Sequence, residues 1–298
     1  MAKDSVVYRT EVRFNAIYVI ESLKPGDPKT GTDLYDQTIY PVTRRLDGLH
    51  AQFFPAQNRD DLIQRLADIG RAVRLDHRLP LIHIEAHGTD DGLELADETQ
   101  ITWRELVPIL GDINQACRMH LIVVAISCRG ANLLHALLPA DRAPLFMLVG
   151  PRGDMTHAQL LEATSRFYEA LVEALLAGED INGALNAMNN GLDYDQWLLR
   201  PYTAEILCCR AFRQFLEQET PEERSEYEDK VVAEVAREQN LDVLQAAALR
   251  QRVRLDLLDR EAHYDRIRET FLMLDLFPEN RPHFGLTFER CIEGTAVS

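Results

Sequence analysis

Two apolar segments of the sequence each lead to a residue that can do chemistry. Residues 80–86 are followed by His87 and Gly88, and residues 121–126 lead through one serine to Cys128. The histidine and the cysteine are 128 − 87 = 41 residues apart, with one predicted helix between them. Neighbouring parallel strands bring the residues after their carboxyl ends to one edge of a sheet, where ligands bind. We therefore expect the imidazole and the thiol to lie side by side at that edge.

This pair of residue types suits nucleophilic catalysis. A thiolate attacks a carbonyl carbon, and a neighbouring imidazole takes the thiol proton and later protonates the leaving amine. The oxyanion that forms needs backbone N–H donors. Gly88 has no Cβ, so its N–H can approach a substrate carbonyl closely. The predicted roles are nucleophile for Cys128, general acid and base for His87, and oxyanion binding by the N–H groups of Gly88 and Cys128.

Each residue alone also has an ordinary structural explanation. A glycine after a strand usually forms a turn, and a cysteine at the end of an apolar strand is usually a small buried hydrophobic residue. Their joint occurrence at two strand ends favours the catalytic interpretation. His83 precedes His87 by four residues and falls on the same face of the predicted strand. We interpret His83 as a core histidine.

Acidic residues close to these strand ends are candidates for substrate binding. Asp154 follows the next apolar run, and Asp90 follows Gly88 by two residues. A carboxylate at this edge could bind an arginine or lysine side chain of a substrate. The structural alternative for both is a turn or helix-cap residue.

The elements that must position these residues alternate between strand and helix over roughly the first two thirds of the chain. Strands are predicted at 15–23, 49–54, 79–86, 119–126 and 144–150, with a hairpin at 92–95 and 100–102. Helices are predicted at 60–73, 102–117 and 156–177 and from Gly130 to about 138, and residues 25–47 are predicted as a polar loop with a short helix. Such alternation predicts an α/β fold with a mostly parallel sheet flanked by helices.

The character of the chain changes after about residue 215, where charges of both signs become dense and apolar residues keep a helical spacing. The sequence therefore predicts an α/β domain over residues 1–215 and an α-helical extension over residues 216–298. Two interpretations of the extension stay open. Its charged faces are solvated surface, or they form an arm that binds an activating partner.

Composition argues against several classes of function. The net charge of −16 repels phosphate backbones, so no nucleic-acid partner is expected. No apolar run approaches the roughly 20 residues needed to cross a bilayer, and the N-terminus does not look like a signal peptide, so no membrane partner is expected. The five cysteines have neither the spacing of a disulfide framework nor that of a zinc site. We expect a cytoplasmic protein without a metal or other cofactor.

The motifs resemble those of the caspase-like cysteine peptidases of clan CD. The caspase signature is Gln-Ala-Cys-Arg-Gly, with a histidine some 50 residues upstream. This sequence keeps Cys128-Arg129-Gly130 and His87-Gly88, but Ile126-Ser127 stands where the family has Gln-Ala. The family's glutamine helps to bind an acidic side chain before the cut, so this departure removes a basis for aspartate specificity.

The bacterial CHAT branch of that family is a closer match. Its members continue with a strand that ends in Val-Gly, a helix with Phe-Tyr-x-x-Leu, a glycine turn and an Ala-Leu helix. This sequence has Leu148-Val149-Gly150, then Phe167-Tyr168-Glu169-Ala170-Leu171, then Gly178 and Ala184-Leu185. The resemblance covers about residues 12–195, and the C-terminal hundred residues or so lie outside it.

The resemblance implies a caspase-like fold and a metal-free endopeptidase with a Cys–His dyad, whose substrate is a protein partner. Bacterial members often cut one dedicated partner in a defence system, including gasdermin-like pore-forming proteins. Two other functions stay open. One is a catalytically silent interaction module that works through its charged helices. The other is a cysteine hydrolase of small amides, although such enzymes usually place the nucleophile before the histidine in the chain.

Overall fold

The protein is described by a computed structural model that forms two compact units. The described residues are 13–127, 130–136, 142–151, 155–177, 181–190, 192, 197, 199–217 and 221–293. The first unit spans the described residues up to Ala204 and also contains Pro282–Phe284. The second unit spans Glu205–Arg281 and the residues from Gly285 onward.

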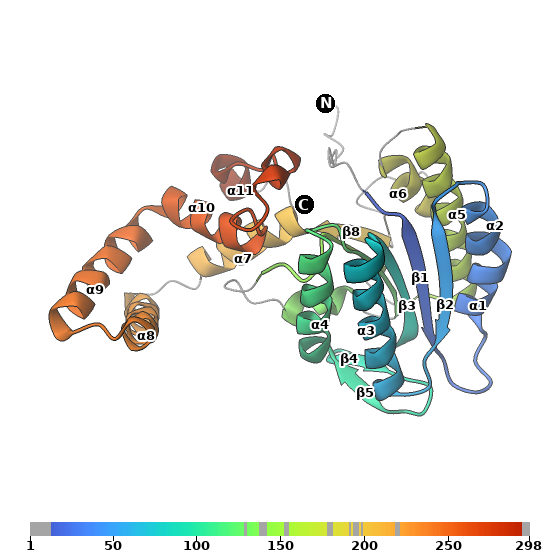
Figure 1. Cartoon of the computed structure of the whole chain (residues 1–298), viewed down its shortest axis with the longest axis horizontal. Coiled ribbons are helices and arrows are strands. Elements are labelled where there is room, and N and C mark those ends of the chain that lie inside the picture. Colours follow the sequence, from blue (N-terminus) through green and yellow to red (C-terminus); the bar gives the residue numbers. More distant parts are fainter. Residues whose placement is uncertain are drawn as a thin grey trace. The chain divides into compact units, whose positions relative to one another are not determined.

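A twisted, mostly parallel sheet forms the centre of the first unit (Figure 1). Its strands are β1 (Ala16–Ser22), β2 (His50–Pro55), β3 (Pro80–Gly88), β6 (Ile122–Ile126), β7 (Met147–Pro151) and β8 (Leu199–Thr203). They lie in the order β2-β1-β3-β6-β7-β8, and every neighbouring pair from β2 to β7 is parallel, whereas β8 is antiparallel to β7. β3 and β6 are therefore interior neighbours in the sheet.

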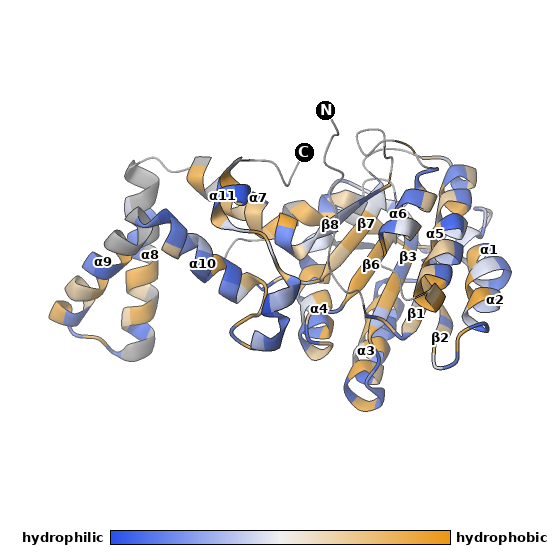
Figure 2. Ribbon diagram, turned by 90° about the horizontal axis from the view of Figure 1, so that it is seen from above, coloured by the Kyte–Doolittle hydropathy of each residue, from blue (hydrophilic) through white to orange (hydrophobic). Residues whose placement is uncertain are grey.

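Burial on both faces explains why the central strands are apolar runs. Every residue of β1, β6 and β7 is buried, and Figure 2 shows β6 and β7 as predominantly hydrophobic ribbons. A parallel sheet covered by helices on both sides selects continuous β-branched and apolar sequence instead of strict alternation. This is the pattern of residues 121–126.

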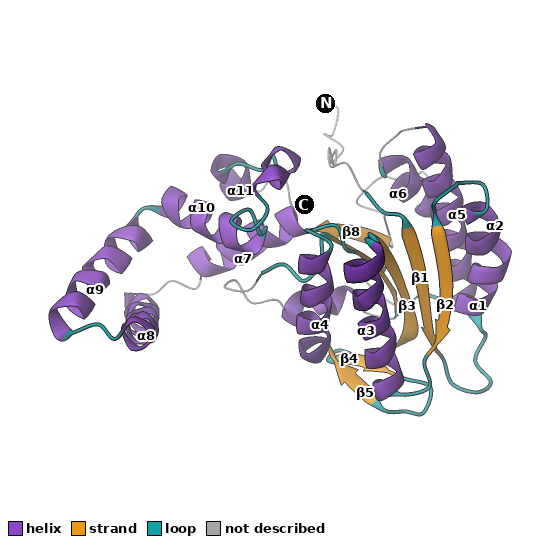
Figure 3. Ribbon diagram, in the orientation of Figure 1, coloured by secondary structure: helices purple, strands orange, loops and turns teal. Residues whose placement is uncertain are grey.

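Helices cover the two faces of this sheet (Figures 1 and 3). One face carries α3 (Arg59–Asp76) and α4 (Trp103–Ala116). The other carries α5 (His157–Ala177) and a continuous helical segment made of α1 (Thr30–Leu34), a π-helical turn (Tyr35–Ile39) and α2 (Tyr40–Thr43). The short helix α6 (Asn182–Met188) follows α5. Alternation along β3 directs His83, Glu85 and His87 to the α5 face, as the contact between His83 and Tyr168 of α5 confirms.

A small hairpin extends the end of β3. Its strands are β4 (Gly92–Glu94) and β5 (Gln100–Thr102), and β4 pairs antiparallel with residues 87 and 88 of β3. Thr102 then begins α4 through a reciprocal capping box with Glu105, in which each side chain satisfies a backbone N–H of the first turn. The predicted hairpin and the predicted start of this helix are confirmed.

The second unit is α-helical. It contains α7 (Ala204–Glu217), α8 (Pro221–Gln239), α9 (Val243–Leu258), α10 (Arg260–Phe271) and α11 (Phe288–Glu293). A 3-10 turn at Pro278–His283 belongs to the second unit up to Arg281. The core of the second unit brings together side chains of α7, α10 and the C-terminal segment: Cys209, Phe212, Tyr264, Leu286 and Cys291. By contrast, Val243 and Leu244 at the start of α9 are 85% and 82% exposed. Across the described ranges, no helix combines the length and apolarity that crossing a membrane requires.

The predicted α/β fold, with a mostly parallel sheet flanked by helices and helices after it, is confirmed. Three local features differ from the predictions. Residues 30–43, within the segment predicted as a polar loop with a short helix, are helical throughout. His87 and Gly88, predicted to follow their strand, are its last two residues, and the edge strand β8 was not predicted. The assignment of separate domains to residues 1–215 and 216–298 stays a prediction, because compact units in one structure do not show which parts fold alone.

Candidate functional site

The register of β3 and β6 brings the two predicted catalytic segments to one edge of the sheet. Glu85 pairs with Ile126 in the parallel ladder. His87 lies two residues beyond Glu85, and Ser127 directly follows Ile126. Cys128, the next residue, lies outside the described residues. His87 and the start of the segment that leads to Cys128 thus share the carboxyl edge.

A tight turn after β1 delivers a carboxylate to this edge. Pro25 and Gly26 are the central residues of a β-turn in which the Asp27 N–H donates to the Lys24 carbonyl at 3.1 Å. Gly26 has a φ of +99°, so proline and glycine occupy the positions that a type II turn favours. The Lys24 N–H donates back to Asp27 Oδ2 at 2.9 Å. The carboxylate is therefore fixed relative to the end of β1.

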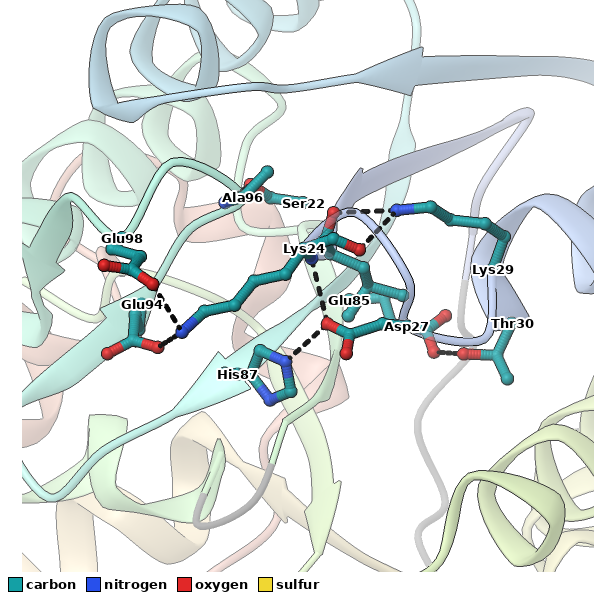
Figure 4. A network of polar contacts seen from close by, with 11 residues as sticks. Ser22, Lys24, Asp27, Lys29, Thr30, Glu85, His87, Glu94, Ala96 and Glu98 are labelled. Carbon is teal, nitrogen blue, oxygen red and sulfur yellow. Dashed lines mark hydrogen bonds and ion pairs between the residues drawn. The ribbon is translucent and has the colours of Figure 1, made fainter.

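That carboxylate contacts the predicted general acid and base. Nε2 of His87 lies 2.8 Å from Oδ2 of Asp27 (Figure 4). The side chains of His87 and Asp27 are 38% and 26% exposed, so the pair is accessible from solvent. The hydrogen bond from His87 lowers the pKa of Asp27 below its ordinary value. Asp27 is therefore ionised at neutral pH.

Two lysines brace the turn that carries Asp27. Lys29 Nζ donates to the carbonyl oxygens of Leu23 at 2.7 Å and of Lys24 at 3.2 Å. Lys24 Nζ forms ion pairs with Glu94 at 2.6 Å and Glu98 at 3.5 Å (Figure 4). Since Glu94 belongs to β4, these contacts tie the turn after β1 to the hairpin that extends β3.

The hairpin also determines the direction of the Gly88 N–H. The Thr89 N–H donates to the Gly92 carbonyl at 2.8 Å, so Thr89 and Gly92 form a hydrogen-bonded pair next to the hairpin turn. Hydrogen-bonded and non-hydrogen-bonded pairs alternate in an antiparallel ladder. Gly88 and Leu93 form the next pair, which is consequently non-hydrogen-bonded. The Gly88 N–H therefore points away from β4. β4 lies on the β1 side of β3, where its neighbour Ala96 donates to the β1 residue Ser22, so this N–H faces the β6 side.

A buried polar network lies on the same face of the sheet as His87. It begins at Glu85, two residues before His87 on β3. Glu85 is buried and accepts a hydrogen bond from the Thr30 hydroxyl of α1. His83 is fully buried, with Nδ1 3.1 Å from the Tyr168 hydroxyl and Nε2 3.5 Å from Glu85 Oε2. Burial holds the pKa of Tyr168 well above its ordinary value, so the hydroxyl stays protonated. The complete burial of His83 agrees with its prediction as a core histidine.

The start of the segment after β6 is closely packed. The Gly130 N–H donates to the Ser127 carbonyl at 2.9 Å. A Cβ built on Gly130 would lie 2.5 Å from the carbonyl oxygen of Ala125. The Ser127 hydroxyl is buried and finds no hydrogen-bond partner within the described ranges. A residue with a Cβ at position 130 would therefore require the backbone to move.

Of the two acidic candidates for substrate binding, Asp90 lies within the described residues. Asp90 lies in the turn between β3 and β4, where its Oδ1 is 3.3 Å from Nδ2 of Asn132. Asn132 follows β6, so this contact bridges the segments that come after β3 and β6. Asp154 lies outside the described residues. A substrate role stays a prediction for both.

The other four cysteines are buried free thiols: Cys117, Cys208, Cys209 and Cys291. Burial raises the pKa of the Cys117 thiol to about 12, and burial likewise raises the pKa of Cys208. Since the thiolate is the nucleophile, neither is suited to catalysis. In the described ranges, no cluster of three or more His, Cys, Asp or Glu side chains could hold a metal ion.

Sequence reasoning missed Asp27. Residues 25–47 are predicted as a polar loop with a short helix, and no site residue is assigned to them. One signal was present, since residues just after parallel strands gather at one edge. Asp27, five residues after the end of β1, is therefore a candidate neighbour of His87.

Comparison with known proteins adds a structural likeness. No family model matches the sequence, and no curated protein matches it. Among solved structures, the chain is similar to caspase-1 from Spodoptera frugiperda, with a TM-score of 0.41 and 14% identity. The alignment covers 68% of this chain and 92% of that chain.

Proposed function

We propose that this protein is a cysteine endopeptidase in which Cys128 is the nucleophile and His87 is the general acid and base. The observation that carries the proposal is the parallel pairing of Glu85 with Ile126. Two residues beyond this pair, the sequence has His87 on one strand and Cys128 after the other. His87 therefore lies close to the carboxyl end of β3, and Cys128 comes two residues after β6 in the sequence, at the edge where α/β sheets bind their ligands.

The proposed reaction has two half-reactions. His87 takes the thiol proton, and the Cys128 thiolate attacks the peptide carbonyl to form a tetrahedral oxyanion. When this collapses, the C–N bond breaks, His87 gives the proton to the leaving amine, and a thioester remains. Water then attacks the thioester carbonyl while His87 takes a proton from it. When this second tetrahedral intermediate collapses, the C–S bond breaks, the second product leaves as a carboxylic acid, and the proton on His87 returns to the Cys128 thiolate.

The direction of the Gly88 N–H supports the proposed oxyanion site. This N–H is not used by the ladder to β4 and faces the β6 side, which is the side of the proposed nucleophile. Removing one such donor typically costs about 10²-fold to 10³-fold in rate. The N–H of Cys128 is the second proposed donor. The proposed contribution of Gly88 is therefore its backbone N–H, which donates to the oxyanion.

The proposed substrate is a protein partner. Asp90 and Asp154 are proposed to favour a basic side chain near the cut, since carboxylates pair well with Arg and Lys. A role in bacterial defence, with a gasdermin-like pore-forming protein as substrate, rests on the resemblance of the sequence motifs. It predicts a single cut in such a protein on a gel. An activating partner is proposed to bind the helices of the second unit, and deletion of residues 221–275 would then abolish activation.

Labelling with peptidyl acyloxymethyl ketones tests the dyad. The thiolate displaces the carboxylate of the probe and forms a stable thioether, which mass spectrometry locates. Probes with Arg, Lys, Asp or Leu before the warhead are compared on the wild-type chain. We expect labelling of Cys128, its loss in Cys128→Ala and His87→Ala, and a preference for the basic probes.

A matched control separates the site from general thiol reactivity. Cys117→Ala removes a thiol from the same unit, but one whose pKa burial raises to about 12. Its labelling should equal that of the wild type. Labelling that persists in Cys128→Ala would reject the assignment of the nucleophile. A wild-type chain that no probe labels, with or without candidate partners, would favour a catalytically silent module.

A further inference from the structure

We propose that Asp27 is a positioning residue that holds the His87 imidazole with Nε2–H on its carboxylate and leaves Nδ1 as the acceptor for the nucleophile. The expected catalytic effect rests on the proposed function, whereas the orientation of the ring does not. The observation is the 2.8 Å contact between His87 Nε2 and Asp27 Oδ2 (Figure 4).

The contact selects one tautomer of the ring. An ionised carboxylate only accepts hydrogen bonds, so Nε2 must carry its proton to bond with Asp27. In the neutral ring Nδ1 then has a free lone pair and can take a proton. The lowered pKa of Asp27 agrees with this arrangement, because its first cause is the hydrogen bond from His87.

The carboxylate is held in place before any substrate binds. Oδ2 of Asp27 accepts from the Lys24 N–H at 2.9 Å as well as from His87. The type II turn defines the backbone of Asp27, and Lys29 clamps the carbonyl oxygens on the β1 side of that turn. A catalytic group supported in this way loses little freedom during the reaction, which is the requirement for precise acid–base catalysis.

The competing explanation is a surface ion pair that does nothing for the ring. Exposed ion pairs often contribute little, and the negative charge of Asp27 would then act only through the general field at the site. The two explanations differ in which atoms matter. A positioning role needs an acceptor oxygen at Oδ2, whereas a field effect needs only the charge.

Three variants of the full-length chain separate these explanations. Asp27→Ala removes both the acceptor and the charge. Asp27→Asn removes the charge but keeps an oxygen that can accept from both donors, and it preserves the turn if the alanine variant fails to fold. Glu98→Ala is the matched control. It removes a carboxylate of the same network that pairs with Lys24 at 3.5 Å and makes no described contact with His87.

The first readout is the tautomer of His87, measured by long-range ¹H–¹⁵N correlation NMR at a pH where the ring is neutral. His87→Ala identifies the resonances. We expect the Nε2–H form in the wild type and in Glu98→Ala, its retention in Asp27→Asn, and a mixture of tautomers in Asp27→Ala. A wild-type ring that carries its proton on Nδ1 would overturn the proposal, even if the enzyme is active.

The second readout is the kinetics of labelling by the preferred acyloxymethyl ketone. A displaced catalytic group lowers the maximal rate without changing probe binding. We expect Asp27→Ala to lower the maximal labelling rate about 10²-fold, as for a misplacement of about 1 Å, with half-saturation unchanged. Asp27→Asn should recover most of this loss. Equal losses in Asp27→Asn and Asp27→Ala, or an unchanged rate in both, would reject a positioning role. Absence of labelling in the wild type would reject the proposed function, and the NMR result would still decide the orientation of His87.

Discussion

Replacing Gly130 by alanine should disable the proposed nucleophile while leaving the fold intact. Gly130 lies two residues after Cys128, and a Cβ at this position would stand 2.5 Å from the carbonyl oxygen of Ala125. Ordinary van der Waals contacts begin at 3.4 Å, so the two atoms must separate by 3.4 − 2.5 = 0.9 Å. Ala125 is a buried residue of β6, and its carbonyl is backbone. The segment around Gly130 is therefore the part that moves.

The expected size of the effect follows from this displacement. A misplacement of about 1 Å at a catalytic group costs on the order of 10² in rate. Overpacking typically costs about 1–3 kcal/mol. We therefore expect Gly130→Ala to lower the maximal rate of probe labelling about 10²-fold, with a loss of stability of about 1–3 kcal/mol in a thermal melt.

Gly150 offers a control that faces the same oxygen atom. A Cβ on Gly150 would lie 3.4 Å from the Ala125 carbonyl oxygen, which is ordinary contact. Gly150→Ala should consequently label within a few-fold of the wild-type rate. Intact-mass measurement of samples quenched at successive times gives the labelling rate of each variant. A thermal melt gives its melting temperature. Wild-type labelling by Gly130→Ala, or equal loss in the two variants, would refute the steric argument.

Three further predictions concern stability and pH. Gly31→Ala places a Cβ 2.9 Å and 3.0 Å from two buried carboxylates of β3 and β1, so we expect a loss of about 1–3 kcal/mol by thermal unfolding. Gly183→Ala, whose Cβ meets nothing within 4 Å, should show no loss. Tyr264→Phe removes the hydroxyl that donates to the Leu286 carbonyl at 2.9 Å, and it should cost about 1–3 kcal/mol in denaturant titration with weaker amide protection of α10. Glu105 has its pKa lowered from 4.5 to about 2 by its capping hydrogen bonds, so its contribution to stability is complete above 4.5 and is lost as the pH falls through about 2. In Glu105→Gln the melting temperature should lose that part of its pH dependence, and an unchanged acid limb would contradict this assignment.

Local chemistry explains why much of the fold was predictable. Residues 121–126 are apolar because β6 is buried on both faces, and this property is visible in the sequence. Thr102 and Glu105 are three residues apart and begin α4 through the reciprocal bonds that this spacing predicts. The alternation of strands and helices then implies a parallel sheet, whose carboxyl edge is the place where His87 lies.

Elements that depend on distant partners were missed. Strand β8 contains Arg200 and Pro201 and has no periodic pattern, and it forms because the edge of β7 is available for antiparallel pairing. The helical segment 30–43 contains glycine, several threonines and a proline, which lower helix propensity. Tertiary packing overrides this preference, since Leu34 and Ile39 are buried and the Thr38 hydroxyl lies 3.2 Å from that of Ser165 on α5.

The sequence by itself determined the α/β architecture, and it predicted the end of β3 to within two residues and the end of β6. These depend on residues close together in the chain, whose conformational preferences act locally. Only the tertiary structure decided that Asp27 meets His87, 60 residues away. That contact depends on β1 and β3 being neighbours in the sheet and on the direction in which the turn leaves β1, and neither is recorded in the types of the two residues.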